Sequence, residues 1–146
     1  MTSRSDSKPI TLVRLYSDGA CPGKCGPASA GVVLYDQDNC LIARRSRILG
    51  ASTVNRAEYQ ALAWGLDEAA KLTRLRVECY LDSDIVEGQL SGRYRLRDDE
   101  LRLLFHRIKD LERPFKEVCY LKVRRDDQRL AVAHQLAHDA LNGRAA

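Results

Sequence analysis

The amino-acid sequence predicts an α/β protein, with helices on both faces of a mixed five-stranded sheet. Two observations predict this class. In the first half, three stretches alternate apolar and polar residues and are separated by short loops (residues 10–17, 29–36 and 40–49), which favours an antiparallel meander. In the second half, helical and strand patterns alternate, so that the order of elements is β-β-β-α-β-α-α-β-α. Strands that are joined through a helix are expected to be parallel neighbours.

The meander is bounded by turn-forming residues. The first strand, ITLVRLYS, is followed by the Gly-Pro-rich loop CPGKCGPAS, and the turn DQDN separates the second strand from the third. A helical pattern rich in Ala, Leu and Glu then runs from Thr53 to Lys71. Ser52 or Thr53 is expected to cap this helix, because a hydroxyl oxygen accepts a hydrogen bond from an unpaired N–H group of the first turn.

The remaining elements alternate in the same way. LRVECYL predicts a fourth strand, and residues 82–92 predict a short helix that ends at Gly92. Residues 98–111 have the spacing of an amphipathic helix that begins at Asp98 and stops before Pro114. FKEVCYLKV predicts the fifth strand, and residues 126–141 predict the last helix.

Length and composition indicate one ordinary globular domain. The chain has 146 residues, of which 45% are hydrophobic and 30% are charged. We expect residues 10–142 to form the domain and the polar residues 1–9 to be a disordered lead. The sequence has no run of 18 apolar residues and no apolar signal core at its start, so we expect a cytoplasmic protein without a membrane span.

The cysteines raise the question of a metal site or a disulfide. Five cysteines are compatible with a reducing compartment, and Cys79 and Cys119 lie in apolar runs that predict burial. In CPGKC, Cys21 and Cys25 flank a Pro-Gly turn. Such a pair supplies two of the four ligands that structural zinc needs, and no histidine forms a second pair with a cysteine. The motif therefore disfavours zinc and leaves a local disulfide open.

Basic residues are clustered although the net charge is only +4. Three arginines alternate with Tyr94 and Leu96, and three more basic residues come later, at and after the end of the fifth predicted strand (Arg93, Arg95, Arg97; Lys122, Arg124, Arg125). Such clusters are typical of proteins that bind polyanions. Charge alone is equally compatible with a solvated surface.

Three acidic residues lie next to apolar segments. Asp18 ends the first predicted strand, Asp82 ends the fourth, and Glu58 precedes Leu62 by one turn on the apolar stripe of the first long helix. A carboxylate on a face directed to the core is costly unless it is paired or bound to metal. If the first and fourth strands are neighbours, the three carboxylates can meet and bind Mg²⁺, which prefers oxygen ligands. Taken singly, each residue is compatible with a cap or a surface charge.

At this point the sequence resembles a known family. LYSDGACPGKCGPASAGVVLYD resembles the first hairpin of type 1 ribonuclease H, and TVNRAEYQALAWGLDEA resembles that family's Asn-x-x-Glu helix. LDSDIVEGQLSGRYRLRDDELRLL resembles its Asp-Ser strand end, which precedes a helix and a basic-aromatic segment. The resemblance covers about residues 10–142 and is to the compact bacterial and archaeal branch.

The resemblance implies a two-metal endoribonuclease that cuts the RNA strand of an RNA–DNA hybrid and leaves 5′-phosphate and 3′-hydroxyl ends. Asp18 would bridge two Mg²⁺ or Mn²⁺ ions, and Glu58 and Asp82 would hold the metal on the leaving-group side. For the substrate, the resemblance implies contacts of two kinds. Backbone at Gly19, Ala20 and Cys21, with Asn55 and Ser83, would contact the hybrid and its 2′-hydroxyls, and Arg93 and Arg95 would contact phosphates.

The last helix departs from the family pattern. The family has an Asp in an Ala-Asp-x-Leu-Ala motif as a fourth ligand, whereas this chain has AHQLA at residues 133–137. His134 stands at that position, and Asp139 is the other candidate. Helix geometry favours His134, because it lies at the edge of the apolar face and Asp139 lies on the opposite side. The family's mobile histidine before this helix is also missing from the segment RRDDQ.

A second class of function remains open beside the nuclease. The His134 departure is compatible with a ribonuclease H fold that binds RNA–DNA hybrid or double-stranded RNA without cutting it. The retained Asp18, Glu58 and Asp82 argue for the enzyme. We expect the protein to be a monomer whose partner is an RNA–DNA hybrid and which does not associate with a membrane.

Overall fold

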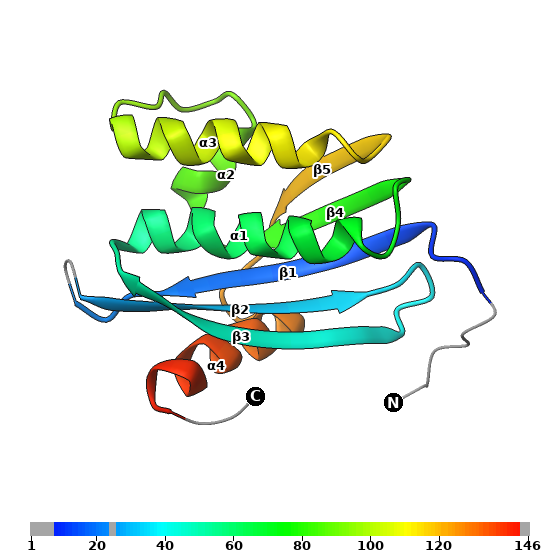
Figure 1. The fold of residues 1–146 in the computed structure, drawn as a ribbon, viewed down its shortest axis with the longest axis horizontal. Coiled ribbons are helices and arrows are strands. Elements are labelled where there is room, and N and C mark those ends of the chain that lie inside the picture. The colour runs from blue at the N-terminus through cyan, green and yellow to red at the C-terminus, as the bar shows by residue number, and fades with distance from the viewer. Residues whose placement is uncertain (1–7, 24–25, 144–146) are drawn as a thin grey trace.

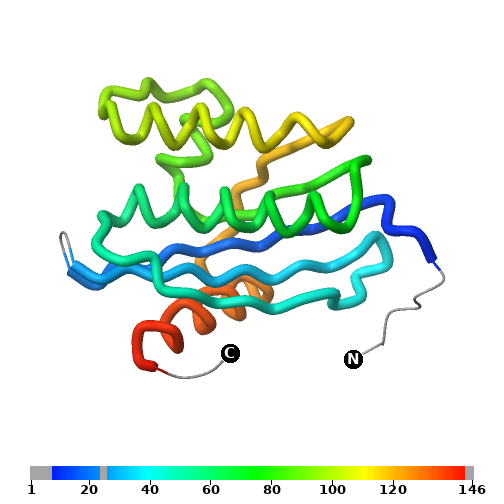
Figure 2. The backbone as a smooth tube through the Cα atoms, in the orientation of Figure 1, coloured from blue at the N-terminus to red at the C-terminus, as the bar shows by residue number. Residues whose placement is uncertain are grey.

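The computed structural model describes residues 8–23 and 26–143. They form a five-stranded sheet with helices on both of its faces (Figure 1; Figure 2). The strands are β1 (Leu12–Ala20), β2 (Pro27–Tyr35), β3 (Leu41–Ala51), β4 (Arg76–Leu81) and β5 (Glu117–Lys122). The helices are α1 (Val54–Ala70), α2 (Asp84–Leu90), α3 (Asp99–Glu112) and α4 (Gln128–Leu141).

The sheet has the strand order β3-β2-β1-β4-β5, with β1 at its centre. β2 pairs antiparallel with both β1 and β3, which is the predicted meander. β1 and β4 pair in parallel, with Leu15 opposite Cys79 and Tyr16 opposite Tyr80, and β4 pairs in parallel with β5. The predicted fold class and order of elements are therefore confirmed. The parallel pair β1–β4 brings the two strand ends that carry Asp18 and Asp82 to the same edge.

The two faces of the sheet have different covers. Helix α1 lies on one face with α3 packed beside it, whereas α4 crosses the opposite face over β1, β2 and β3 (Figure 1). Successive residues of β1 alternate accordingly: Val13 and Leu15 belong to the main core under α1, and Tyr16 packs with Leu130 and Ala133 of α4. Side chains at the end of β1 can therefore meet groups from both helices.

Helix α4 approaches the sheet unusually closely at β2. A Cβ atom on Gly31 would lie 1.9 Å from the carbonyl oxygen of Ala133, so only glycine leaves room for the helix at this point. Next to it, the Ser29 hydroxyl donates a hydrogen bond of 2.5 Å to the carbonyl of Ala137. These contacts fix the height of α4 above the sheet and hence the position of His134.

The helix boundaries follow capping residues that the sequence predicts. Thr53 caps α1 by accepting from the Arg56 N–H, and Asp98 caps α3 by accepting from the N–H groups of Glu100 and Leu101. The last helix begins two residues later than predicted, because Asp127 is its cap. Gly92, with a φ of 83°, follows α2 in a conformation that glycine adopts readily.

The two cysteines that were predicted to be buried differ in their exposure. Cys79 is fully buried as predicted, but Cys119 is only half-buried, because β5 is an edge strand and its thiol faces Arg76.

Within the expected lead, the carbonyl of Pro9 accepts a hydrogen bond from Gln37 at 3.0 Å. Residues 1–7 and Cys25 lie outside the described residues, as does any pairing of Cys21 with Cys25. Among the residues that the structure describes, no helix has the length and apolar composition needed to cross a membrane.

Candidate active site

Three carboxylates from three elements meet at the carboxyl end of β1. Asp18 comes from β1, Asp82 follows the last residue of β4, and Glu58 comes from the second turn of α1. One ligand oxygen from each lies within 4.8 Å of the others. Asp18 and Glu58 are buried and Asp82 is half-buried. The parallel pairing of β1 with β4 is the local cause of this convergence, since it aligns the two strand ends.

Gly19 allows α1 to bring Glu58 to the strand end. A Cβ atom at this position would lie 2.4 Å from the backbone of Ala57, which is too close for any other residue without a shift. At this short range the Gly19 N–H donates a hydrogen bond to Glu58 Oε1 at 3.2 Å. The same backbone contact therefore positions the carboxylate and holds the first loop against the helix.

The three carboxylates destabilise one another's charge. Burial raises the pKa of Glu58 well above its ordinary value, and the adjacent Asp18 and Asp82 raise it further. Burial and Asp18 also raise the pKa of Asp82, while Arg125, whose Nε lies 3.6 Å from Asp82 Oδ2, lowers it. Ionised carboxylates at this spacing need a cation. Their oxygen donors suit hard divalent ions such as Mg²⁺ and Mn²⁺, so the residues present fit the expected metal.

His134 lies at this cluster, and Asp139 does not. The Nδ1 atom of His134 is 2.6 Å from Asp18 Oδ2, on the side of Asp18 that faces α4. The His138 ring lies one turn further along, with its centroid 4.3 Å from that of His134. Asp139 instead accepts a hydrogen bond from Gln135 and lines a separate groove with Arg44 of β3. Of the two candidates left by the sequence, only His134 is within reach of the carboxylates.

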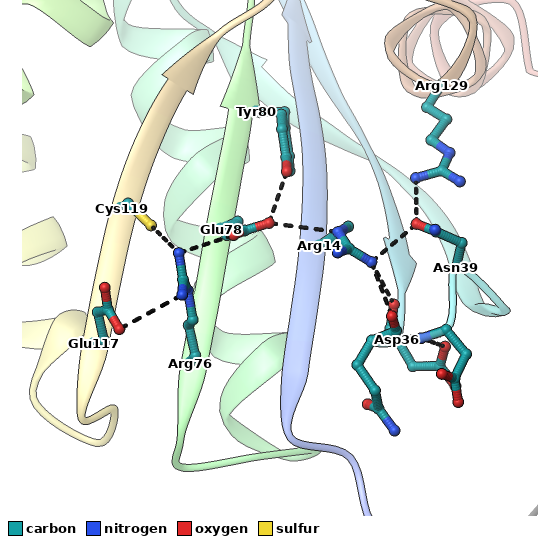
Figure 3. Close-up of polar contacts among 11 residues, drawn as sticks. Arg14, Asp36, Asn39, Arg76, Glu78, Tyr80, Glu117, Cys119 and Arg129 are labelled. Carbon is teal, nitrogen blue, oxygen red and sulfur yellow. Dashed lines mark hydrogen bonds and ion pairs between the residues drawn. The ribbon is translucent and has the colours of Figure 1, made fainter.

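A stacked pair of tyrosine rings lies next to the two aspartates on the same face of the sheet. Tyr16 and Tyr80 each precede an aspartate by two residues, so they lie on the same strand face as Asp18 and Asp82. Their rings stack across β1 and β4 with centroids 4.5 Å apart and an angle of 7° between planes. The Tyr80 hydroxyl donates to Glu78 at 2.7 Å (Figure 3). This stack holds the two strands in register directly behind the carboxylates.

Further charged groups continue this network along the sheet. Glu78 is flanked by guanidinium groups from Arg14 and Arg76 at 3.4 and 3.0 Å. Arg14 also donates to the side-chain oxygen of Asn39, which accepts a second hydrogen bond from Arg129 of α4 (Figure 3). The network therefore connects β1, β4 and the first turn of α4 on the face that carries the aspartates.

A pocket of about 620 Å³ opens over the carboxylates. Four of the residues predicted to bind substrate line it, namely Gly19, Ala20, Cys21 and Ser83. The Cys21 sulfur lies 3.1 Å from the carbonyl oxygens of both Gly23 and Ser52, so its single S–H group can donate to either and places this loop near the start of α1. Asn55 is half-buried in the first turn of α1, beside Val54, which lines the pocket.

The two arginines predicted to contact phosphates lie outside this pocket. Arg93 forms a two-pronged ion pair with Glu87, with N–O distances of 2.9 and 3.0 Å, and lies over the ring of Tyr94. The guanidinium group lowers the pKa of Glu87. Arg95 is exposed on the segment between α2 and α3. Both side chains are accessible from solvent, and Arg93 would have to release Glu87 in order to bind a phosphate.

The set of predicted site residues lacks three titratable residues of this pocket: Asp84, Arg125 and His138. A signal existed for the first, because Asp84 follows Asp82 by two residues in the same Asp-Ser-Asp segment. His138 follows His134 by four residues and is thus on the same helix face. Arg125 belongs to a basic cluster that the sequence showed, but its approach to Asp82 depends on the path of the loop between β5 and α4.

Comparison with known proteins agrees with this geometry. The family model described as Reverse transcriptase-like matches residues 16–140. The protein named ribonuclease HI from Halobacterium salinarum is 36% identical over 130 residues, which is 89% of this chain. The crystal structure of RNase H1 from the same organism has a TM-score of 0.86 and 35% identity, and covers 90% of this chain and 98% of that one. The chain belongs to the ribonuclease HI family.

A further ribonuclease H1 structure is relevant to the pocket. LC11-RNase H1, solved in complex with an RNA/DNA hybrid, has a TM-score of 0.82 and 27% identity, and covers 90% of this chain and 97% of that one. Several relatives are longer than this chain. This ribonuclease HI chain spans 64% of the Halobacterium protein and 36% of the mycobacterial proteins that it matches at 34% identity.

Proposed function

We propose that this chain hydrolyses the RNA strand of RNA–DNA hybrids in a reaction that depends on divalent metal ions. The convergence of Asp18, Glu58 and Asp82, with ligand oxygens within 4.8 Å of one another, is the observation that carries this proposal. Membership of the ribonuclease HI family and the likeness to a structure that contains an RNA/DNA hybrid support the choice of substrate.

The residues that would hold the metal are the three carboxylates and His134. Two bound ions would supply a water of lowered pKa as nucleophile and would stabilise the departing 3′-oxygen, which leaves 5′-phosphate and 3′-hydroxyl ends. Asp18 is central in this arrangement, because it is close to Glu58 and Asp82 on one side and to His134 on the other. The Gly19 N–H keeps one oxygen of Glu58 oriented.

The mouth of the pocket would select RNA. The backbone of Gly19, Ala20 and Cys21 is held against α1 by the thiol contacts of Cys21, so it offers a rigid edge to the minor groove. Together with the side chains of Asn55 and Ser83, this edge would contact 2′-hydroxyls, which distinguish RNA from DNA. Arg93 and Arg95 would bind backbone phosphates and make the affinity depend on salt.

The imidazole of His134 changes the expected metal preference. A site with three carboxylates and one imidazole carries one negative charge less than a site with four carboxylates. Nitrogen ligands suit Mn²⁺ better than Mg²⁺, so we expect higher activity with Mn²⁺. Equal or higher rates with Mg²⁺ across a full titration of both metals would contradict this part of the proposal.

Cleavage of a labelled RNA–DNA hybrid tests the function directly. The RNA strand should be cut only when Mg²⁺ or Mn²⁺ is present, and the Asp82→Asn variant should be inactive. Asp139→Asn is the matched control, since it removes an equivalent charge outside the pocket and should retain activity. If neither metal supports cutting while the hybrid still binds, the chain is a binding module and the proposal of an enzyme fails.

A further inference from the structure

A second hollow lies beside the candidate active site, at the carboxyl end of β5. It has a volume of about 850 Å³ and is lined by Asp82, Lys122, Val123, Arg124, Arg125 and Asp126. Two of these residues, Asp82 and Arg125, also line the pocket over the carboxylates. The two hollows therefore share a wall, and a chain of nucleotides that lies in one can continue into the other.

The cations of this hollow are accessible and weakly held. The side chains of Arg124 and Arg125 are 88% and 93% exposed. Arg124 contacts both carboxylate oxygens of Asp126, each at 3.3 Å, and Arg125 Nε lies 3.6 Å from one oxygen of Asp82. The Arg124–Asp126 pair is exposed on both sides, and exposed ion pairs of this kind are weak. A phosphate can therefore replace the aspartate partner at little cost.

Asp84 connects this hollow with the basic segment that follows α2. One of its oxygens accepts a hydrogen bond from the Tyr94 hydroxyl at 2.8 Å, and the other accepts from Lys122 Nζ at 3.2 Å. Lys122 at the end of β5 is thereby fixed near Tyr94 and its neighbour Arg93, although 28 positions separate Lys122 from Tyr94 in the sequence. The cations on both sides of Asp82 consequently form one rim around the end of β4.

We propose that Lys122, Arg124 and Arg125 form a subsite that binds phosphate groups of the nucleic-acid backbone next to the scissile position. The subsite deepens the proposed function and rests on it, because the hollow adjoins the proposed catalytic carboxylates. Its ligand is defined by chemistry as a chain of phosphodiesters, which these side chains contact by charge and hydrogen bonds without reading the bases. Asp84 is a positioning residue that keeps Lys122 on this rim.

The test measures binding without cleavage. A fluorescent RNA–DNA hybrid is titrated with the chain in EDTA at several salt concentrations, so that the result does not depend on catalysis. Lys122→Gln/Arg124→Gln should weaken binding and reduce the slope of log affinity against log salt by about 0.9 for each phosphate that is no longer neutralised, or about 1.8 in all. Lys71→Gln/Arg113→Gln is the matched control, because it removes the same charge from the far ends of α1 and α3.

A gain of affinity provides the second arm. Asp126→Asn frees Arg124 in the hollow, and Asp110→Asn frees Arg113 elsewhere, and both original pairs are 3.3 Å long. Only Asp126→Asn should tighten binding, by about two- to fivefold at 0.1 M salt, because charges beyond about 10 Å are screened at that concentration. Equal slopes for the two double variants, or equal affinities for the two asparagine variants, would overturn the subsite. Binding that responds as expected in a chain that cuts no RNA would retain the subsite and reject the proposed enzyme.

Discussion

The substitution Gly31→Ala tests how the fold positions His134. The added Cβ would lie 1.9 Å from the carbonyl oxygen of Ala133, whereas ordinary contacts begin at 3.4 Å, so α4 must retreat by about 1.5 Å. Ala133 precedes His134, and the same retreat would lengthen the 2.6 Å distance between His134 and Asp18 beyond hydrogen-bond range. A displacement of about 1 Å at a reacting centre can cost about 100-fold in rate. We therefore expect a loss of activity of about that size.

The loss has to be separated from a general loss of stability. Overpacking of this kind destabilises a fold by about 1–3 kcal/mol, so rates are measured well below the melting temperature, which is determined by circular dichroism. Gly65→Ala is the control. The atoms nearest to its Cβ would be those of the Leu15 side chain, at 2.6 to 3.1 Å, and it lies on α1, away from His134. This control should change the melting temperature while keeping most of the activity.

Two results would refute the reasoning about α4. One is a Gly31→Ala chain that keeps the wild-type rate, which would mean that the helix height does not govern the site. The other is a loss of rate that Gly65→Ala reproduces at equal stability, which would assign the effect to folding. A shift of metal preference in Gly31→Ala alone would support the role of His134 directly.

Three further predictions concern the site. His134→Ala should lose far more activity than Asp139→Ala, and His134→Asp should raise the rate with Mg²⁺ relative to Mn²⁺; initial rates with each metal would reveal the opposite order if the assignment of the helix face were wrong. Tyr80→Leu should weaken Mn²⁺ binding in calorimetry by several-fold, whereas Tyr80→Phe, which keeps the stack on Tyr16, should match the wild type. In metal-free buffer, stability should fall as the pH rises through the raised pKa of Glu58, because the folded state binds more protons there than the unfolded chain. Chemical denaturation at several pH values should show a flatter dependence for Glu58→Gln, and an unchanged slope would contradict the assignment.

Much of the fold could be predicted because its signals are local. The apolar run within 29–36, the cap at Thr53 and the stop before Pro114 are properties of neighbouring residues, and the structure has elements at each of these places. The convergence of Asp18 with Asp82 required one additional inference, namely that strands joined through a helix pair in parallel. The sequence could supply this inference because the connection rules are general.

The remaining parts of the site depend on tertiary distances. Arg125 reaches Asp82 only through the path of the loop after β5, and Asp84 is linked to Lys122 only because β5 lies beside β4. No periodicity in the sequence reports either contact. The exposure of Cys119 was mispredicted for a related reason, since an apolar run does not reveal whether its strand lies at an edge of the sheet.

The histidine at position 134, which stands where the family has an aspartate, changes the chemistry of the site and leaves the fold unchanged. Gly31 and Ser29 fix the height of α4 through contacts with the backbone of Ala133 and Ala137, and neither contact involves the side chain at position 134. A carboxylate or an imidazole can therefore occupy this position on the same helix. Because burial and mutual repulsion already raise the pKa of Glu58 and Asp82, an imidazole at position 134 avoids the further negative charge that a fourth carboxylate would add to the cluster.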